Sequence, residues 1–307
     1  MFGSAKRSFA RKDHAACSGC SLCLLVCPVW RQTHDPRMTP EGRAKALQHG
    51  ATPADIVASV QSCTLCGACE PVCPEEIDLV GMTLDLRTRL ADAQALEAVH
   101  LRINELRTGA RPSNPARIVL IPGAVLRARP AALGRIAALL DARTCDEAAT
   151  QIGDALEAGH RVAKNRLADF LESLRSAHTI VVEDGLWLRH LRGRLPKKRI
   201  MGLGEALSGL GAVRRRLREG DLYIIESRAY HADYQRLVKH YDRLRAERGC
   251  VFNLDLQRIA IPTAGQADWI LKGRTIDRVV VERLEDAAPF ERDGRYTVVH
   301  LAELADH

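Results

Sequence analysis

Apolar positions in this chain follow a helical spacing in its first third and fall into short runs beyond it. The helical stripe extends from Leu79 to Leu106 and predicts one long amphipathic helix. A shorter helix is predicted before it, because Thr52 can cap the backbone and Pro53 suits the first helical position. Residues 1–110 should therefore form a helical domain.

Beyond the turn-forming segment 111–116, short apolar runs alternate with longer helical patterns. The runs predict buried strands at Ile118–Ile121, Thr179–Val182, Leu222–Ile225 and Arg278–Val281. The helical patterns predict helices at Ala131–Leu140, Ile152–Leu174 and Tyr234–Ala246. Because the alternation occurs twice, two small α/β modules are predicted, at residues 117–220 and 221–307. Together with the helical first domain, this makes the fold class α+β.

Composition and charge narrow the choice of partners. Apolar residues make up 46% of the chain, which is enough to bury a core. The net charge of +7 suits an acidic partner protein, and two basic runs, 189–199 and 214–218, are either solvated or a docking face for one. Nucleic acid is not expected, because aromatic residues make up only 4% and no DNA- or RNA-binding motif is present. No apolar stretch reaches the roughly 18 residues of a transmembrane segment, so any membrane association should be peripheral and made through partners.

The ten cysteines are distributed unevenly: eight lie between Cys17 and Cys73, and only Cys145 and Cys250 follow. A secreted disulfide scaffold would spread its bridges over the whole chain, so the clustering indicates metal ligation in a reducing cytoplasm. Cys145 and Cys250 each lack a neighbouring cysteine and are expected to be inert, buried thiols.

The clustered cysteines form two runs of one pattern: three cysteines with two residues between neighbours, and then a fourth followed by proline. The runs are Cys17-x2-Cys20-x2-Cys23-x3-Cys27-Pro28 and Cys63-x2-Cys66-x2-Cys69-x3-Cys73-Pro74. In two-cluster ferredoxins the fourth cysteine of such a run ligates the other cluster. The pattern therefore predicts two [4Fe–4S] clusters, the first held by Cys17, Cys20, Cys23 and Cys73 and the second by Cys63, Cys66, Cys69 and Cys27.

Zinc and disulfides are the alternatives for these cysteines. Structural zinc prefers paired Cys-x-x-Cys knuckles, and a triple run that ends in Cys-Pro is a poor match to them. Three cysteines with only two residues between neighbours also cannot be paired sensibly in bridges. Iron–sulfur clusters are the favoured interpretation.

With its two Cys-Pro runs and the intervening Pro36-Arg-Met-Thr-Pro-Glu-Gly-Arg43, the chain resembles the helical two-cluster domain of a family of iron–sulfur subunits. The family includes those of glycolate oxidase, anaerobic glycerol-3-phosphate dehydrogenase and heterodisulfide reductase. The resemblance implies a ferredoxin-like first domain in an electron-transfer subunit of a multisubunit oxidoreductase. It also implies partners: a flavoprotein (FAD) dehydrogenase subunit and, beyond the clusters, another redox subunit or a quinone-linked acceptor.

Family members often continue into two cysteine-rich modules, each with a Cys-Cys-Gly signature. Frames of such modules are visible here, but their cysteines are nearly all absent. Thr144-Cys145-Asp146 and Pro262-Thr263-Ala264 stand about where the signatures would fall, and Trp187 and Arg283 stand near the places of later cysteines. The resemblance therefore gives no thiolate-bound catalytic cluster in residues 117–307, and the modules are expected to be a docking scaffold.

Two other functions stay open at this point. A catalytic subunit with its own substrate site in residues 117–307 would need a ligand pocket there. A cluster-dependent regulator or adaptor would need neither a substrate nor a flavin partner. A non-catalytic electron-transfer subunit is the favoured function.

Overall fold

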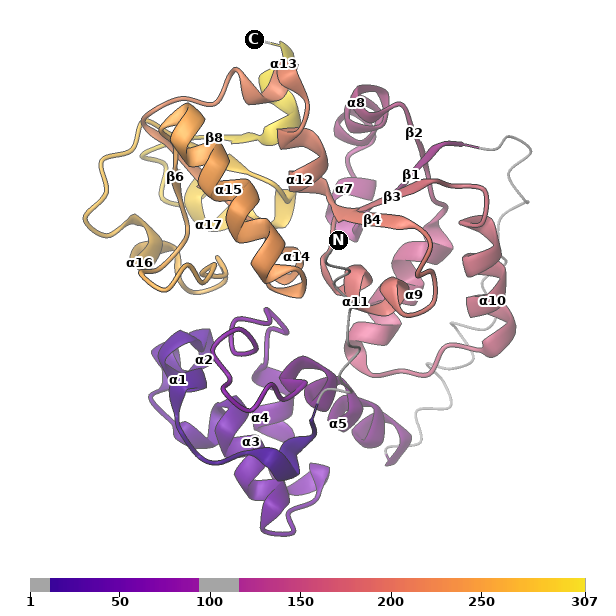
Figure 1. Ribbon diagram of the computed structural model, residues 1–307, viewed down its shortest axis with the longest axis vertical. Coiled ribbons are helices and arrows are strands. Elements are labelled where there is room, and N and C mark those ends of the chain that lie inside the picture. Colours follow the sequence, from indigo (N-terminus) through magenta and orange to yellow (C-terminus); the bar gives the residue numbers. More distant parts are fainter. Residues whose placement is uncertain (1–11, 94–115, 307) are drawn as a thin grey trace, which may run out of the picture.

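The computed structural model of the chain describes residues 12–93 and 116–306, which form three lobes (Figure 1). A helical lobe comes first in the sequence, and two α/β lobes follow it. None of the helices in these two ranges is long and apolar enough to span a bilayer. The part of the predicted long helix beyond Ala93 and most of the predicted linker lie outside the described residues.

Short helices joined by tight turns build the helical lobe. They are η1 His14–Ala16, α1 Leu22–Val26, α2 Pro28–Thr33, η2 Pro36–Met38, α3 Pro40–Gln48, η3 Pro53–Ile56, α4 Val57–Ser62 and α5 Leu79–Ala93. The predicted helix start is confirmed, because Thr52 and Asp55 form a capping box at η3, which leads into α4. Leu86 and Leu90 of α5 pack on Val60 of α4, so this part of the apolar stripe belongs to the core.

Gly42 allows α3 to lie directly against η2. A Cβ atom at Gly42 would come within 2.2 Å of the Pro36 carbonyl oxygen and 2.8 Å of the Arg37 Cα atom. Thr39 caps α3, with its hydroxyl oxygen accepting a hydrogen bond from the Gly42 amide at 3.1 Å. These contacts set the rotation of α3 about its own axis, and therefore the directions of the side chains on either side of Gly42.

Each α/β lobe contains a four-stranded parallel sheet. The first has the order β2-β1-β3-β4, formed by β1 Ile118–Ile121, β2 Ala142–Thr144, β3 Thr179–Val182 and β4 Arg199–Gly202. The second has the order β6-β5-β7-β8, formed by β5 Asp221–Ile224, β6 Val251–Phe252, β7 Arg278–Val281 and β8 Thr297–His300. The two orders are equivalent, so one topology occurs twice. The four strands predicted from sequence are the central pair of each sheet.

Helices pack against both sheets. The first lobe has α7 Ala124–Arg127, α8 Pro130–Leu140, α9 Glu147–Ala158, α10 Lys164–Ser173, α11 Leu186–Arg192, α12 Leu203–Ser208 and α13 Gly211–Arg214. The second has α14 Ser227–Ala232, α15 Tyr234–Arg248, α16 Ala267–Leu271, η4 Leu284–Asp286, α17 Ala288–Glu291 and η5 Leu301–Asp306. The single helix predicted at Ile152–Leu174 is wrong: Gly159, with φ of 87°, ends α9, and α10 begins afresh.

Successive side chains of each strand point to opposite faces of its sheet. On one face, the side chains of the two sheets meet in a single core. Leu120 and Val181 of the first sheet belong to the same buried core as Tyr223 and Val280 of the second. The opposite faces have separate cores under α9–α11 and under α16 and α17. The two α/β lobes therefore share one hydrophobic core.

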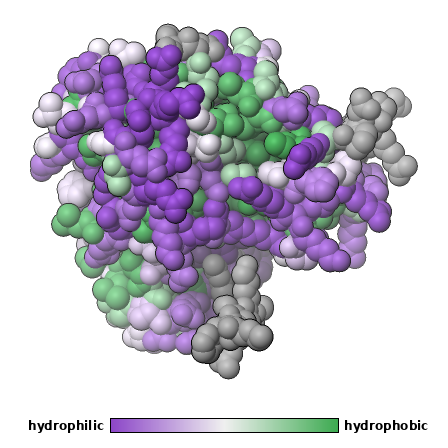
Figure 2. Space-filling model, turned by 45° about the horizontal axis from the view of Figure 1, so that its top comes forward, coloured by the Kyte–Doolittle hydropathy of each residue, from purple (hydrophilic) through white to green (hydrophobic). Residues whose placement is uncertain are grey.

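Hydrophilic side chains cover most of the face drawn in Figure 2, with hydrophobic side chains in smaller areas.

The first basic run is only partly available to solvent. Arg189 of α11 lies against the helical lobe, where it pairs with Glu70 at 2.6 Å and also with Asp78. This arginine joins two lobes, so it is not part of a free docking face.

Candidate metal centres

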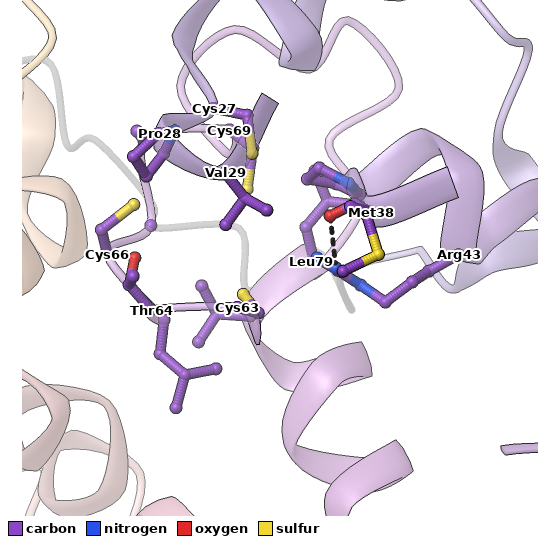
Figure 3. A pocket seen from close by; sticks show the side chains of 15 residues that line it. Cys27, Pro28, Val29, Met38, Arg43, Cys63, Thr64, Cys66, Cys69 and Leu79 are labelled. Atoms are coloured by element: carbon purple, nitrogen blue, oxygen red, sulfur yellow. Dashed lines mark hydrogen bonds between the residues drawn. The ribbon is translucent and has the colours of Figure 1, made fainter. Parts of the chain in front are cut away.

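Two cavities in the helical lobe are each lined by four of the clustered cysteines. Cys17, Cys20, Cys23 and Cys73 line the first cavity, which has about 330 Å³ of space, part of it open to solvent. Cys27, Cys63, Cys66 and Cys69 line the second cavity, which has about 390 Å³ (Figure 3). Each cavity thus takes three cysteines from one run and the fourth from the other. Leu79 lines both, so the two cavities share a wall.

The two cysteine loops have left-handed residues at equivalent positions. In the first loop these are Gly19, with φ of 79°, and Ser21, with φ of 61°; in the second they are Leu65, at 55°, and Gly67, at 76°. Each loop has glycine at only one of the two positions, and the non-glycine residue costs about 1–2 kcal/mol in this conformation. Turns of this kind point successive backbone N–H groups to one side, as at many iron–sulfur sites.

Backbone carbonyls of the second loop, and that of Pro28 after Cys27, accept hydrogen bonds from side chains elsewhere in the chain. The accepting carbonyls and their donors are Cys63 with Arg87 at 2.6 Å, Thr64 with Arg228 at 3.0 Å, Cys66 with His231 at 2.7 Å and Pro28 with Gln266 at 3.3 Å. Arg87 belongs to α5, whereas Arg228, His231 and Gln266 belong to the second α/β lobe. The second cavity is therefore supported by two lobes.

The first loop is held from within its own lobe. The Cys17 carbonyl oxygen accepts hydrogen bonds from Lys45 Nζ and Gln48 Nε2 of α3, both at 2.9 Å. Cys20 is exposed, whereas Cys27 and Cys66 of the second cavity are buried. The first cavity is the more accessible of the two.

His231 is buried, and its two ring nitrogens have different roles. Nε2 accepts a hydrogen bond from the Ala260 amide at 3.2 Å, so the ring proton lies on Nδ1, which donates to the Cys66 carbonyl. Burial lowers the pKa of His231 to about 4, so the ring is neutral at neutral pH. A Cβ atom on Gly67 would lie 3.1 Å from the His231 Cβ, which shows how closely α14 packs on the loop.

Burial raises the pKa of several thiols in both cavities. The pKa of Cys23 rises to about 12 and that of Cys66 to about 11, and the pKa values of Cys27 and Cys69 rise as well. In each case the largest cause is the loss of hydration of the thiolate. Such thiols stay protonated at neutral pH unless a metal replaces the proton. Their chemistry suits metal-bound thiolates and not free nucleophiles.

Arg43 places a buried positive charge beside the second cavity. It is 1% exposed, and its Nη1 donates to the carbonyl oxygens of Ser59 at 2.9 Å and Met38 at 3.3 Å (Figure 3). Its Nε has no hydrogen-bond partner, and no carboxylate of a described residue pairs with it. A buried cation is costly without an anion nearby. A cubane bound by four thiolates is an anion, so the residues of this cavity fit such a group.

Among residues 12–93 and 116–306, no three His, Cys, Asp or Glu side chains come close enough together to hold a single metal ion. The clustered cysteines surround cavities and do not converge on one point. Cys145 and Cys250, which the sequence predicts to be buried thiols, are both buried.

A third cavity, of about 550 Å³, lies at the carboxyl ends of β1 and β3, where the strand order of the first sheet reverses. Asp154, Asp184 and Glu285 line it, together with Trp187 and Arg283. The last two are the positions near which the resemblance would place cysteines, and no cysteine lines this cavity. Sequence reasoning missed it because its residues come from both α/β lobes. The acidic pair directly after a buried strand, Glu183-Asp184, was the available signal.

One comparison with known proteins matches the helical lobe. Residues 13–77, about a fifth of the chain, match the family model of a 4Fe-4S dicluster domain. The matched segment contains all eight clustered cysteines, so the match supports an iron–sulfur protein, implies 4Fe–4S binding in this lobe and suggests electron transfer. No curated protein and no solved structure matches the chain.

Proposed function

We propose that this protein is an electron-transfer subunit of a multisubunit oxidoreductase and holds two [4Fe–4S] clusters. Cys17, Cys20, Cys23 and Cys73 are assigned to the first, and Cys63, Cys66, Cys69 and Cys27 to the second. The observation that carries the proposal is the pair of four-cysteine cavities that share Leu79 as a wall. When bound, each cluster supplies one-electron transfer.

The rest of the chain has supporting tasks in this proposal. The helical domain, 1–110, carries the sites. The module 221–307 supports the second site, and the two α/β modules, 117–220 and 221–307, form a scaffold for docking. The exposed Cys20 and its exposed neighbours Leu22 and Leu25 give an outside redox partner access to the first site. The resemblance supports a flavoprotein dehydrogenase as one partner and a quinone-linked or other redox acceptor as the second. The clustering of eight cysteines between Cys17 and Cys73 supports a reducing, cytoplasmic location.

Anaerobic purification tests the number of clusters. The isolated protein should contain about eight irons and eight sulfides per chain. Cys145→Ser and Cys250→Ser should keep this content, because both thiols lie outside the two cavities. A wild-type content of about four irons would overturn the two-cluster proposal. Zinc in place of iron would contradict cluster binding at both sites.

Paired cysteine variants test the exchange of the fourth ligand between the runs. Cys73→Ser should remove the same EPR signal of the reduced protein as Cys17→Ser. Cys27→Ser should remove the signal that Cys63→Ser removes. If Cys27→Ser instead matches Cys17→Ser, each run binds its own cluster and the assignment is wrong.

Affinity capture of the tagged holoprotein tests the partner. A stoichiometric flavin-containing subunit should be retained, and its reduced flavin should bleach the absorbance of the clusters. Specific retention of DNA with no flavoprotein would favour a cluster-dependent regulator.

The third cavity favours a second candidate, a catalytic subunit with a ligand site in its α/β lobes. Ligands commonly bind where the strand order of a parallel sheet reverses, which is where this cavity lies. A small-molecule library screened by thermal shift, with Asp154→Asn as comparison, tests it. A compound that stabilises only the wild-type protein would support the catalytic candidate.

A further inference from the structure

Glu41 and Arg43 lie on α3, on either side of Gly42. Residues two positions apart point to nearly opposite sides of a helix. Glu41 accordingly lines the first cavity, and Arg43 lines the second. Helix α3 therefore passes between the two sites and presents an acid to one and a base to the other.

Both charges lie where water screens them poorly. Arg43 is 1% exposed and has no carboxylate partner among the described residues. The Oε2 atom of Glu41 is buried and has no hydrogen-bond partner, and its Oε1 lies 3.7 Å from the position of a Cβ on Gly19 in the first loop. Charges in such surroundings act on a neighbouring site more strongly than surface charges do.

Most of the other charged groups near the second cavity are paired, and the one without a carboxylate partner among the described residues is positive. Arg87 donates only to backbone carbonyls among its described hydrogen bonds, those of Val60, Gln61, Cys63 and Glu157. Arg228 also reaches the second loop, but Glu157 and Asp184 balance its charge. Glu70, beside Cys69, shares the guanidinium of Arg189 with Asp78. The second site therefore has two arginines without a carboxylate partner among the described residues.

The first cavity has a different balance. Glu75 lines it together with Glu41, and pairs with the exposed Lys12 at 3.4 Å. Lys45 contacts the Cys17 carbonyl and is the remaining cation at this loop, only partly buried and also bonded to Gln48. On this side, the charged-group atom that is buried and has no hydrogen-bond partner is the Oε2 of Glu41.

Reduction adds one negative charge to a cluster, so a nearby cation raises its potential and a nearby anion lowers it. We infer that α3 makes the two sites unequal, with Glu41 lowering the potential of the first cluster and Arg43 raising that of the second, so that electrons pass from the accessible first site to the enclosed second one. This inference rests on the proposed function. The greater exposure of the first cavity acts in the opposite direction, and the substitutions below separate the two effects because they leave exposure nearly unchanged.

A potentiometric titration of the anaerobic holoprotein, followed by EPR and visible absorbance, tests the inference. The wild-type protein should show two one-electron waves, assigned by the wave that Cys17→Ser or Cys63→Ser removes. Arg43→Gln should move the second-site wave to lower potential and leave the first where it was. Arg43→Lys, which keeps the charge, should leave the second-site potential close to its wild-type value. Arg37→Gln removes a charge that is 88% exposed and should move neither wave.

Glu41→Gln gives an independent test, because its partly exposed side chain makes misfolding less of a concern than at Arg43. It should raise the potential of the first-site wave alone. The inference is overturned if neither substitution changes the potential of its wave, or if the first site has the higher potential in the wild type. Either outcome leaves the proposed function standing. A single wave from wild-type protein that holds about eight irons would also overturn the inference, because the two sites would then have equal potentials. About four irons per chain would overturn the proposed function itself.

Discussion

The Nδ1 atom of His231 lies 2.7 Å from the carbonyl oxygen of Cys66, across 165 residues of sequence. Through this hydrogen bond, α14 of the second α/β lobe holds the loop that carries three of the four cysteines of the second cavity. The bond makes that cavity depend on a lobe that contributes no cysteine to it. In the first cavity, the Cys17 carbonyl is held by Lys45 and Gln48 of α3, within the helical lobe.

Replacing His231 by alanine should loosen the second site selectively. The substitution opens a buried space and leaves the Cys66 carbonyl and the Ala260 amide without their partner, at a cost of about 2–4 kcal/mol. Thermal denaturation under argon should show a lower midpoint, and iron should be lost mainly from the second site. His178→Ala, at an exposed position, should change neither quantity. Equal loss from both sites would contradict the selective role.

Gly67→Ala should be more harmful than Gly50→Ala. Both glycines have a left-handed backbone, with φ of 76° and 86°, so alanine costs about 1 kcal/mol of strain at each. At Gly67 the new Cβ would also lie 3.1 Å from the His231 Cβ, whereas at Gly50 it would meet nothing within 4 Å. The extra loss of stability at Gly67, read from the thermal midpoints, therefore measures the contact with α14. Identical midpoints would mean that this contact is unimportant.

Arg189→Ala should weaken the attachment of the first α/β lobe to the helical lobe. Glu70, whose carboxylate is largely buried, loses an ion pair at 2.6 Å, which costs on the order of 3 kcal/mol. Amide hydrogen exchange should increase across the second cysteine loop, residues 63–73. The double variant Arg189→Ala with Glu70→Gln should lose less stability than the two single variants together, because no charged Glu70 is left buried without its partner. Arg175→Ala, which breaks an exposed pair, is the control.

Glu183→Gln should stabilise the protein above neutral pH. Burial, then the neighbouring Glu285, raise the pKa of Glu183 to about 7, whereas an unfolded glutamate titrates near pH 4.5. The folded state therefore binds more protons between these values, and the wild type loses stability as pH rises from about 4.5 to 7.

Glutamine carries no charge and can still accept the hydrogen bond that the Gly123 amide donates to this side chain at 2.6 Å. The gain over wild type should grow from near zero at pH 4.5 to at most about 3 kcal/mol at pH 8. Urea denaturation at both pH values measures it, and Glu172→Gln, at an exposed position, should show no such growth. A gain that shrinks with pH would mean that Glu183 is ionised in the folded state over the whole range.

Local sequence was sufficient for some of these features. The spacing of the cysteine runs singled out the eight residues that line the two cavities, because a tight loop gathers cysteines that are close in sequence. Apolar runs were sufficient for the central strands β1, β3, β5 and β7, which are buried on both faces. The edge strands β2, β4, β6 and β8 were missed, because they are short and their apolar pattern is interrupted. The break at Gly159 was missed because apolar residues on either side of it keep the helical spacing.

By itself, then, the sequence determined the cysteine sets, the capped start of η3 at Thr52 and the repeated strand–helix order, since each depends on neighbours along the chain. Only the tertiary structure decided that His231 reaches Cys66, that Glu41 and Arg43 face different cavities, and that Trp187 and Arg283 meet at a third. Those relationships depend on how helices rotate and dock. The close approach of Gly42 to Pro36 and the core shared by the two α/β lobes set these orientations, through contacts between segments far apart in the chain.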